Sequence, residues 1–202
     1  MEPYLANYKA IIFDMDGTLV DSLKSHFDAW EIALNHFGIP FNQQFIHSLS
    51  GTPSINIAEK LCTIHGAKAD PKELALYKFH TWEQLNPTPN LIPATAKIFY
   101  EHLERIPLAV GTGAKRESAE LLLENVGLLN QLTALVTASD VQNGKPSGET
   151  FYTAARIMDI EPCNCVVFED TDIGKQAAHD AEMDCYLITP SGFRYYPFES
   201  KS

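Results

Sequence analysis

Residues 9–22 read KAIIFDMDGTLVDS, and this stretch decides the fold. Its first five residues are mostly apolar and predict a buried strand over Lys9–Phe13. Asp14 and Asp16 follow directly, and residues two apart on an extended chain point the same way. Two like charges that converge at a strand end are unfavourable unless a cation neutralises them, and Mg²⁺ prefers such hard oxygen ligands. Gly17 then lets the chain turn sharply close to a ligand.

Four more β-prone runs occur later in the chain, and helical patterns lie between most of them. Strands that alternate with helices imply βαβ crossovers and a mostly parallel sheet. The nearly continuous apolar character of these runs is typical of strands covered on both faces. We therefore expect an α/β fold, a Rossmann-like parallel sheet with helices on both faces. The further predicted strands are Leu108–Thr112, Thr133–Thr137, Cys165–Phe168 and Cys185–Ile188.

The stretch between the first two predicted strands differs from the rest, because it contains no convincing strand. Apolar residues at helical spacing predict three helices there, which end near Gly38, Gly66 and the proline-rich residues 86–89. A block inserted after the carboxyl end of a strand lies above the usual ligand crevice of an open α/β sheet. The expected division is a core of residues 1–22 and 93–202 and a helical cap of residues 23–92, with hinges at Asp21-Ser22 and Pro87–Pro93.

Polar groups follow each of the next three predicted strands. Thr112 and Gly113 offer a hydroxyl and backbone amides near a helix start, a plausible anion cradle. Lys145 follows the third strand, and Glu169 and Asp170 close the fourth. Taken singly, these are equally explained as a turn, a solvated lysine and a charged helix N-terminus. Together they lie at the carboxyl ends of successive strands, where one crevice can collect them.

The segments DMDGTLVDS, VGTGAKRES, GKPSGETF and FEDTDIG resemble, in this order, the four motifs of the haloacid dehalogenase-like hydrolase superfamily. The chain is most similar to the β-phosphoglucomutase-like and sugar-phosphatase branch, which has a small helical cap after the first strand. The resemblance implies that Asp14 is the nucleophile and forms an aspartyl-phosphate. It implies that Asp16 protonates the leaving oxygen and then activates the hydrolytic water. The dehalogenating branch lacks this second aspartate, so halide chemistry is disfavoured.

The resemblance also implies a Mg²⁺ cofactor. The ion would bind Asp14, the backbone carbonyl of Asp16 and Asp170, with Glu169 as a ligand either directly or through water. A phosphate dianion must approach the Asp14 carboxylate, and the cation offsets the repulsion between them.

The remaining motif residues would handle the phosphoryl group. By resemblance, Thr112 and the Gly113 backbone hold the transferring oxygens, and Lys145 neutralises the nucleophile and the phosphoryl charge. The third motif departs from the family pattern at Gly148, where a proline is usual; we expect a looser helix start there and no lost role for Lys145. Glu182 stands where relatives often have glycine, so it carries strain if that turn needs a left-handed residue.

Two positions in the cap bear on the substrate. His26 is either a packed histidine or a residue near the cleft that touches Asp16 or substrate, and the sequence leaves both readings open. Gly51 lies in a predicted turn that could reach over the site and bind substrate. In mutase relatives a basic side chain just after the matching glycine binds a second phosphate. Here residues 52–59, which follow Gly51, contain no Lys or Arg.

The resulting prediction is a Mg²⁺-dependent phosphatase acting on a small phosphorylated metabolite, by resemblance a sugar phosphate such as fructose 1-phosphate. A β-phosphoglucomutase-type isomerase stays open as an alternative, because charge for a second phosphate could come from elsewhere in the chain. A phosphate-binding protein without catalysis is a further alternative, although every acid of the motifs and the lysine are present.

The composition limits the partners. The 15 Lys and Arg stand against 26 Asp and Glu, a net charge of -11, which disfavours nucleic acid and anionic membrane surfaces. No stretch approaches the roughly 20 apolar residues of a membrane span, and the N-terminus lacks the features of a signal peptide. The four cysteines have no metal-binding spacing, and we expect reduced core thiols, with Cys163 and Cys165 on one face of a strand. We expect a cytoplasmic monomer or weak dimer.

Overall fold

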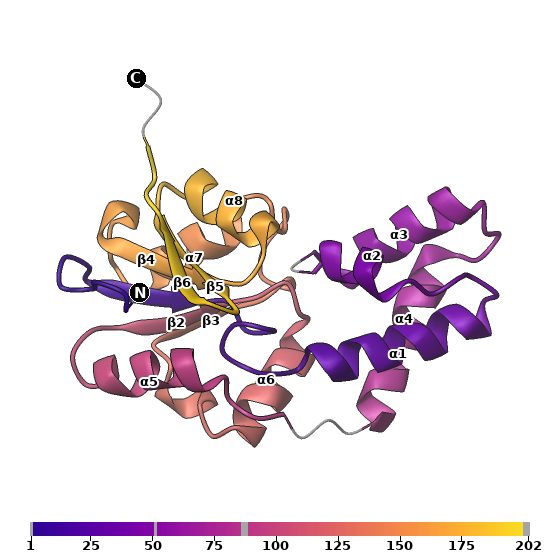
Figure 1. Ribbon diagram of the computed structural model, residues 1–202, viewed down its shortest axis with the longest axis horizontal. Coiled ribbons are helices and arrows are strands. Elements are labelled where there is room, and N and C mark those ends of the chain that lie inside the picture. Colours follow the sequence, from indigo (N-terminus) through magenta and orange to yellow (C-terminus); the bar gives the residue numbers. More distant parts are fainter. Residues whose placement is uncertain (1, 51, 86–88, 200–202) are drawn as a thin grey trace.

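The computed structural model describes residues 2–50, 52–85 and 89–199. Its core is a six-stranded sheet of order β3-β2-β1-β4-β5-β6, in which the first five strands are parallel and β6 is antiparallel (Figure 1). This confirms the expected α/β class. The strands are β1 (Ala10–Phe13), β2 (Leu108–Gly111), β3 (Ala134–Val136), β4 (Cys165–Glu169), β5 (Asp184–Thr189) and β6 (Gly192–Tyr196).

Both faces of the sheet are covered by helices, as the apolar strands require. Along β1, Ile11 and Phe13 pack on the face covered by α5 and α6, while Ala10 and Ile12 pack on the face covered by α7 and α8. This split follows from the period of two along a strand, and it explains why every residue of β1 is apolar and buried. The helices are α5 (Pro93–His102), α6 (Arg116–Asn125), α7 (Glu149–Ile157) and α8 (Asp172–Asp180), with short 3₁₀ turns η1 (Leu129–Gln131) and η2 (Pro162–Asn164).

The central strand β1 pairs with β2 on one side and β4 on the other. The chain thus leaves β1 toward one edge of the sheet and later returns to the opposite side. In open α/β sheets this arrangement makes a crevice outside the carboxyl ends of the strands, where ligands bind. The residues that follow β1, β2 and β4 therefore meet at one place.

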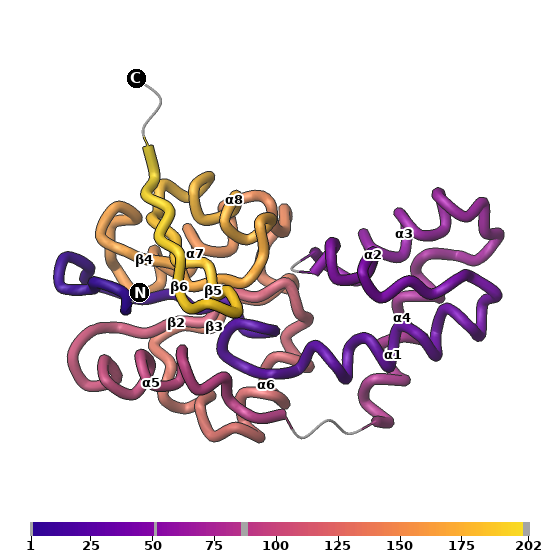
Figure 2. Tube along the Cα trace, in the orientation of Figure 1, coloured from indigo at the N-terminus to yellow at the C-terminus, as the bar shows by residue number. Residues whose placement is uncertain are grey.

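In the described part of the chain, four helices between β1 and α5 form a group beside the core, which we call the cap (Figures 1 and 2). They enclose their own small apolar core, with α4 packed against α1 and α3. The two connections to the core are held together by backbone hydrogen bonds from Asp21 to Asn90 and from Ile92 to Leu19. The cap helices are α1 (Leu23–His36), α2 (Gln43–Ser48), α3 (Ser54–His65) and α4 (Pro71–Leu85).

The structure departs from the sequence expectations in a few places. The short helix α2 and the strand β6 were not expected. Cys163 is exposed in η2 and is no core thiol, whereas Cys165 is buried in β4. Glu182 has a φ of 59°, the left-handed conformation that the expectation of strain required. Within the described ranges, no helix combines the length and apolar character needed to cross a bilayer.

The looser helix start expected at Gly148 is wrong. Its backbone N–H donates to Asp180 Oδ2 at 2.7 Å, which ties the start of α7 to the end of α8. A Cβ atom added at Gly148 would lie 2.5 Å from the backbone nitrogen of Ala181. Glycine is therefore present because the two helices approach too closely here for a side chain.

Candidate active site

Three carboxylates meet at the ends of β1 and β4. Asp14 directly follows β1, Glu169 is the last residue of β4, and Asp170 comes next. The parallel register that pairs Phe13 with Phe168 brings them to the same level. One oxygen from each carboxylate lies within 4.8 Å of the other two, and all three groups are wholly or largely removed from solvent.

Lys145 reaches this cluster from the loop after β3. Its Nζ donates to Asp14 Oδ1 at 2.5 Å and to Glu169 Oε1 at 2.9 Å, and the side chain is completely buried. Burial lowers the pKa of a lysine, but the charges of Asp14 and Glu169 outweigh this effect and raise the pKa of Lys145. The ammonium is therefore charged and holds two of the three carboxylates.

A divalent cation fits the charge that remains. Three carboxyl groups face one ammonium in this buried site, and burial raises the pKa of Asp14 well above its ordinary value despite the opposing charge of Lys145. Burial and the neighbouring charge of Glu169 raise the pKa of Asp170 to about 7, which marks a carboxylate without sufficient positive charge nearby. Thr18 donates to its Oδ1 at 3.2 Å. Carboxylate oxygens such as those of Asp14 and Asp170 are ligands that Mg²⁺ prefers.

Glu169 is held in place more fully than the other two acids. Its Oε2 accepts from the backbone N–H groups of Asp170 and Thr171, at 2.8 and 2.7 Å, and from the Thr171 hydroxyl at 2.8 Å. Its Oε1 accepts from Lys145. A carboxylate with four donors has few free lone pairs, so this geometry favours contact with a cation through water over direct ligation.

Thr112 follows β2 and lines the same pocket as Asp14. Its backbone N–H donates to Val136 of β3 at 2.9 Å, and its hydroxyl accepts from the backbone N–H of Ala114 at 3.0 Å. Because the hydroxyl accepts from the chain, its own proton is free for an anionic oxygen. Thr112 and Gly113 both line the pocket that opens above Asp14.

Asp16 is the centre of a second polar group that joins the core to the cap. The hydroxyl of Ser22 donates to Asp16 Oδ1, and Nε2 of His26 lies 3.1 Å from the same oxygen. Burial acts to raise the pKa of Asp16, but His26, Ser22 and Lys78 outweigh it, and the pKa is lowered. The His26 ring stacks on Trp82 with a centroid separation of 5.2 Å.

Lys78 of α4 completes this group, and the sequence did not lead us to predict it as a site residue. Its Nζ lies 2.8 Å from Nδ1 of His26 and 5.7 Å from the ring centre of Trp30. Burial lowers its pKa to about 8, and the charge of Asp16 opposes this shift only in part. A signal was present, because Leu74, Lys78 and Trp82 recur at intervals of four and place a lysine in an apolar helical stripe.

The pocket lies between Asp14 and the cap. Its core side presents Asp14, Asp16 and Thr112, and its cap side is mostly apolar, with a few hydroxyl groups. Gly51, predicted to bind substrate, lies outside the described residues. The cap residues that line the pocket are Leu23, His26, Phe27, Trp30, Ile46, Ser50, Thr52, Ser54, Ile57 and Lys78.

The structure therefore brings most of the predicted site residues into one place. Asp14, Glu169, Asp170 and Lys145 form one cluster, and Asp16, which contacts His26, lines the same pocket as Asp14. A buried carboxylate, a charged lysine and a poised second acid can carry out nucleophilic transfer of an anionic group.

Several known proteins are similar to this chain in sequence or in fold. The chain is 38% identical over 178 residues to the fructose-1-phosphate phosphatase YqaB of Escherichia coli, covering 88% of this chain and 94% of the relative. It is 28% identical over 183 residues to the β-phosphoglucomutase of Bacillus subtilis, covering 87% and 80%. The crystal structure of β-phosphoglucomutase from Clostridium difficile has the same fold, with a TM-score of 0.79, 23% identity, and coverage of 88% and 83%.

A family model also matches most of the chain, over residues 11–188, and it describes haloacid dehalogenase-like hydrolases. The matched range begins inside β1 and ends inside β5, so it includes all four motifs and the cap. The two curated relatives named above are a fructose-1-phosphate phosphatase and a β-phosphoglucomutase, each matched over most of its length. The chain belongs to the haloacid dehalogenase-like hydrolase family.

Proposed function

We propose that this protein is a Mg²⁺-dependent phosphatase that hydrolyses a small phosphorylated metabolite through an aspartyl-phosphate at Asp14. The observation that carries the proposal is the position of Asp14. One of its oxygens is held by Lys145 in the acid cluster, and its carboxylate also lines the pocket that faces the cap. A phosphate group in the pocket would meet a nucleophile, a cation site and the second acid at once.

In the first step, a free oxygen of Asp14 attacks phosphorus, and the bond from phosphorus to the substrate's ester oxygen breaks. Asp16 donates a proton to that departing oxygen. Thr112 and the backbone of Gly113 hold the phosphoryl oxygens, and Lys145 offsets their charge. When bound, Mg²⁺ would be held by Asp14, Asp170 and the carbonyl of Asp16 and would supply further positive charge against the dianion.

In the second step, water attacks phosphorus, and the bond to the Asp14 oxygen breaks to release inorganic phosphate. Asp16 takes the proton from the attacking water. Its lowered pKa suits this role, since the ionised form is held ready by Ser22 and His26. For the first step the carboxyl must carry a proton, and the arriving phosphate dianion favours that state by charge repulsion.

The pocket supports a substrate with a single phosphate. Among the described lining residues, Lys78 is the one ammonium group, and it is already engaged with His26. Thr52 and Ser54 line the cap side of the pocket, and neither side chain can offset the charge of a second phosphate. Trp30 and Phe27 offer flat apolar surface, which suits the C–H face of a sugar beside a few hydroxyl donors. A sugar monophosphate is therefore our leading substrate class, with fructose 1-phosphate the first candidate because of the Escherichia coli relative.

A screen of phosphorylated sugars and acids, with and without Mg²⁺, tests the proposal by release of inorganic phosphate. We expect release from at least one sugar monophosphate and none after the metal is removed by a chelator. The rival isomerase is tested with β-glucose 1-phosphate and a bisphosphate primer. Appearance of an isomeric sugar phosphate with little inorganic phosphate would replace our proposal by a mutase.

Two further properties belong to the same proposal. All four cysteines are free thiols, three of them buried, which suits a reducing compartment and our proposed cytoplasmic location. The division into a core of residues 1–22 and 93–202 and a cap of residues 23–92 is supported by helix starts at Leu23 and Pro93. We propose a monomer or weak dimer, to be checked by sedimentation.

A further inference from the structure

A close contact joins the cap to the core beside Lys145. A Cβ atom placed on Gly144 would lie 2.9 Å from Cγ and 3.3 Å from Cδ of Pro53, a residue of the cap. The backbone of Gly144 has no positive φ, so an alanine there meets no conformational penalty of its own. The lack of a side chain at this position is therefore explained by the proline ring that packs on it.

On the core side, the loop that carries this contact is firmly held. Glu149, at the start of α7, accepts from the backbone N–H groups of Gln142 and Asn143 at 2.9 and 2.8 Å. The next residues continue to Lys145, whose ammonium is fixed by two carboxylates. The loop cannot yield easily, so any pressure at Gly144 acts on the cap.

On the cap side, Pro53 moves with a helix. It is the N-cap residue of α3, and its carbonyl accepts from the N–H groups of Asn56 and Ile57 at 2.9 and 3.2 Å. Its neighbours Thr52 and Ser54 both line the pocket above Asp14. The position of Pro53 therefore determines the positions of the Thr52 and Ser54 hydroxyl groups in the pocket.

We propose that Pro53 packs on Gly144 and that this contact sets the distance between the cap and Asp14. Pro53 and Gly144 are then positioning residues that act on specificity. They carry no chemistry themselves, and they bring Thr52 and Ser54 to the substrate's leaving group. The inference rests on the proposed function for its kinetic consequence, whereas the contact itself does not depend on turnover.

Three variants test the contact between Pro53 and Gly144: Gly144→Ala, Pro53→Ala and the double variant. Gly144→Ala adds a methyl group against the ring, Pro53→Ala removes the two ring atoms that it would meet, and the double variant relieves the clash. Because the proposal has the cap shift to relieve the clash, we expect all three proteins to fold with similar thermal stability. Each protein is studied as the full chain.

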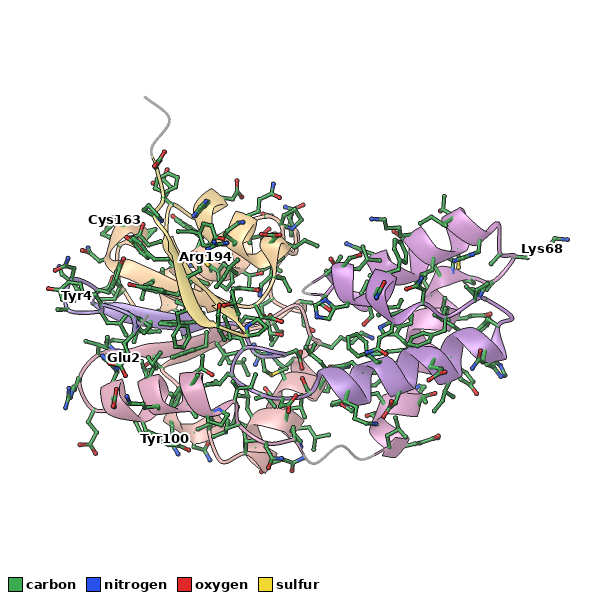
Figure 3. All side chains as sticks on the ribbon, viewed as in Figure 1. Glu2, Tyr4, Lys68, Tyr100, Cys163 and Arg194 are labelled. Carbon is green, nitrogen blue, oxygen red and sulfur yellow. The ribbon has the colours of Figure 1, made fainter. Side chains whose placement is uncertain are left out.

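The first readout is the distance between cap and core, measured by energy transfer between two dyes. Cys163 is the exposed native thiol on the core, and Lys68→Cys supplies a second site at the far end of the cap (Figure 3). We expect Gly144→Ala to lengthen the mean distance between the two dyes. The double variant should show the same distance as Pro53→Ala. An unchanged distance in Gly144→Ala, or no restoration in the double variant, would overturn the proposal.

The second readout is kinetic and uses the best sugar phosphate from the screen beside p-nitrophenyl phosphate. We expect Gly144→Ala to lower kcat/KM for the sugar phosphate by about tenfold to a hundredfold, with a smaller loss for the aryl ester. An equal loss for both would indicate damage to Lys145 and contradict a role in specificity. A wild-type protein that releases no phosphate refutes the proposed function. The dye distances then still test whether the contact between Pro53 and Gly144 sets the position of the cap.

Discussion

Nζ of Lys78 and Nδ1 of His26 lie 2.8 Å apart, although 52 positions separate the two residues in the chain. A protonated lysine can only donate, so Nδ1 of His26 accepts and its Nε2 carries the proton that points to Asp16. Burial, and after it the charge of Lys78, lower the pKa of His26 and keep the ring neutral. A residue of the cap thereby fixes the orientation of a group beside the proposed acid and base.

Replacing Lys78 should impair catalysis more than substrate binding. In Lys78→Met, Nδ1 of His26 loses its donor, the tautomer is no longer fixed, and the hydrogen bond to Asp16 weakens. We expect kcat to fall by about tenfold to a hundredfold, as is typical for the loss of a partner behind a reacting group. Steady-state kinetics on the best substrate measure this. Lys78→Arg keeps the charge and serves as the control. A normal kcat in Lys78→Met would show that the contact between Lys78 and His26 does not contribute to catalysis.

The same lysine predicts a pH dependence. Its pKa is lowered to about 8, so it is charged below that pH and becomes neutral above it. A neutral amine can accept as well as donate, so it no longer enforces the His26 tautomer that donates to Asp16, and kcat should decline as the pH rises through about 8. An arginine keeps its charge far above this range, so in Lys78→Arg the decline should be absent there. Identical pH profiles for the two proteins would refute this assignment.

Thr112 should matter through its hydroxyl group. We expect Thr112→Ala to lower kcat by about a hundredfold, the usual loss when one donor to a developing charge is removed. Thr112→Ser keeps the hydroxyl that accepts from Ala114 and should retain most of the activity. Comparable losses in the two variants would mean that packing between β2 and β3, and not the hydroxyl, is what Thr112 supplies.

Gly148 offers a prediction for stability. A methyl group at this position meets the backbone of Ala181 at the end of α8, and crowding of this kind costs about 1–3 kcal/mol. Urea unfolding of Gly148→Ala should show this loss in the free energy of unfolding. Gly38→Ala is a useful contrast, because its Cβ would meet nothing within 4 Å and only its φ of 67° opposes the change. Wild-type stability of Gly148→Ala would contradict the proposed close approach.

Much of the core could be predicted because its signals are local. The strand over 10–13 is entirely apolar, and its carboxylates follow at once, so one stretch of sequence indicates strand, burial and site together. The strand β6 was missed because its residues 192–196 are half-exposed and mix arginine with tyrosine. Its place depends on distant partners, since Asp184 accepts from the Tyr195 hydroxyl at 2.7 Å and from the N–H of Phe198.

The cap side of the site was harder to predict for a related reason. Lys78 is one of two lysines on α4, and its partner His26 comes from another helix, so the pattern along α4 alone does not reveal the contact. The contact between Pro53 and Gly144 joins cap and core and leaves no trace at either position except a glycine. Contacts between elements depend on how the layers dock, which spacing along one element does not determine.

The most direct test of the account is a chemical trap for the aspartyl-phosphate at Asp14. Borohydride added during turnover with Mg²⁺ reduces an acyl phosphate to the alcohol, so residue 14 should become homoserine, detected by peptide mass spectrometry. Asp14→Asn should give neither turnover nor homoserine. Rapid turnover with residue 14 unmodified, or with the reduced residue elsewhere in the chain, would contradict the assignment of the nucleophile.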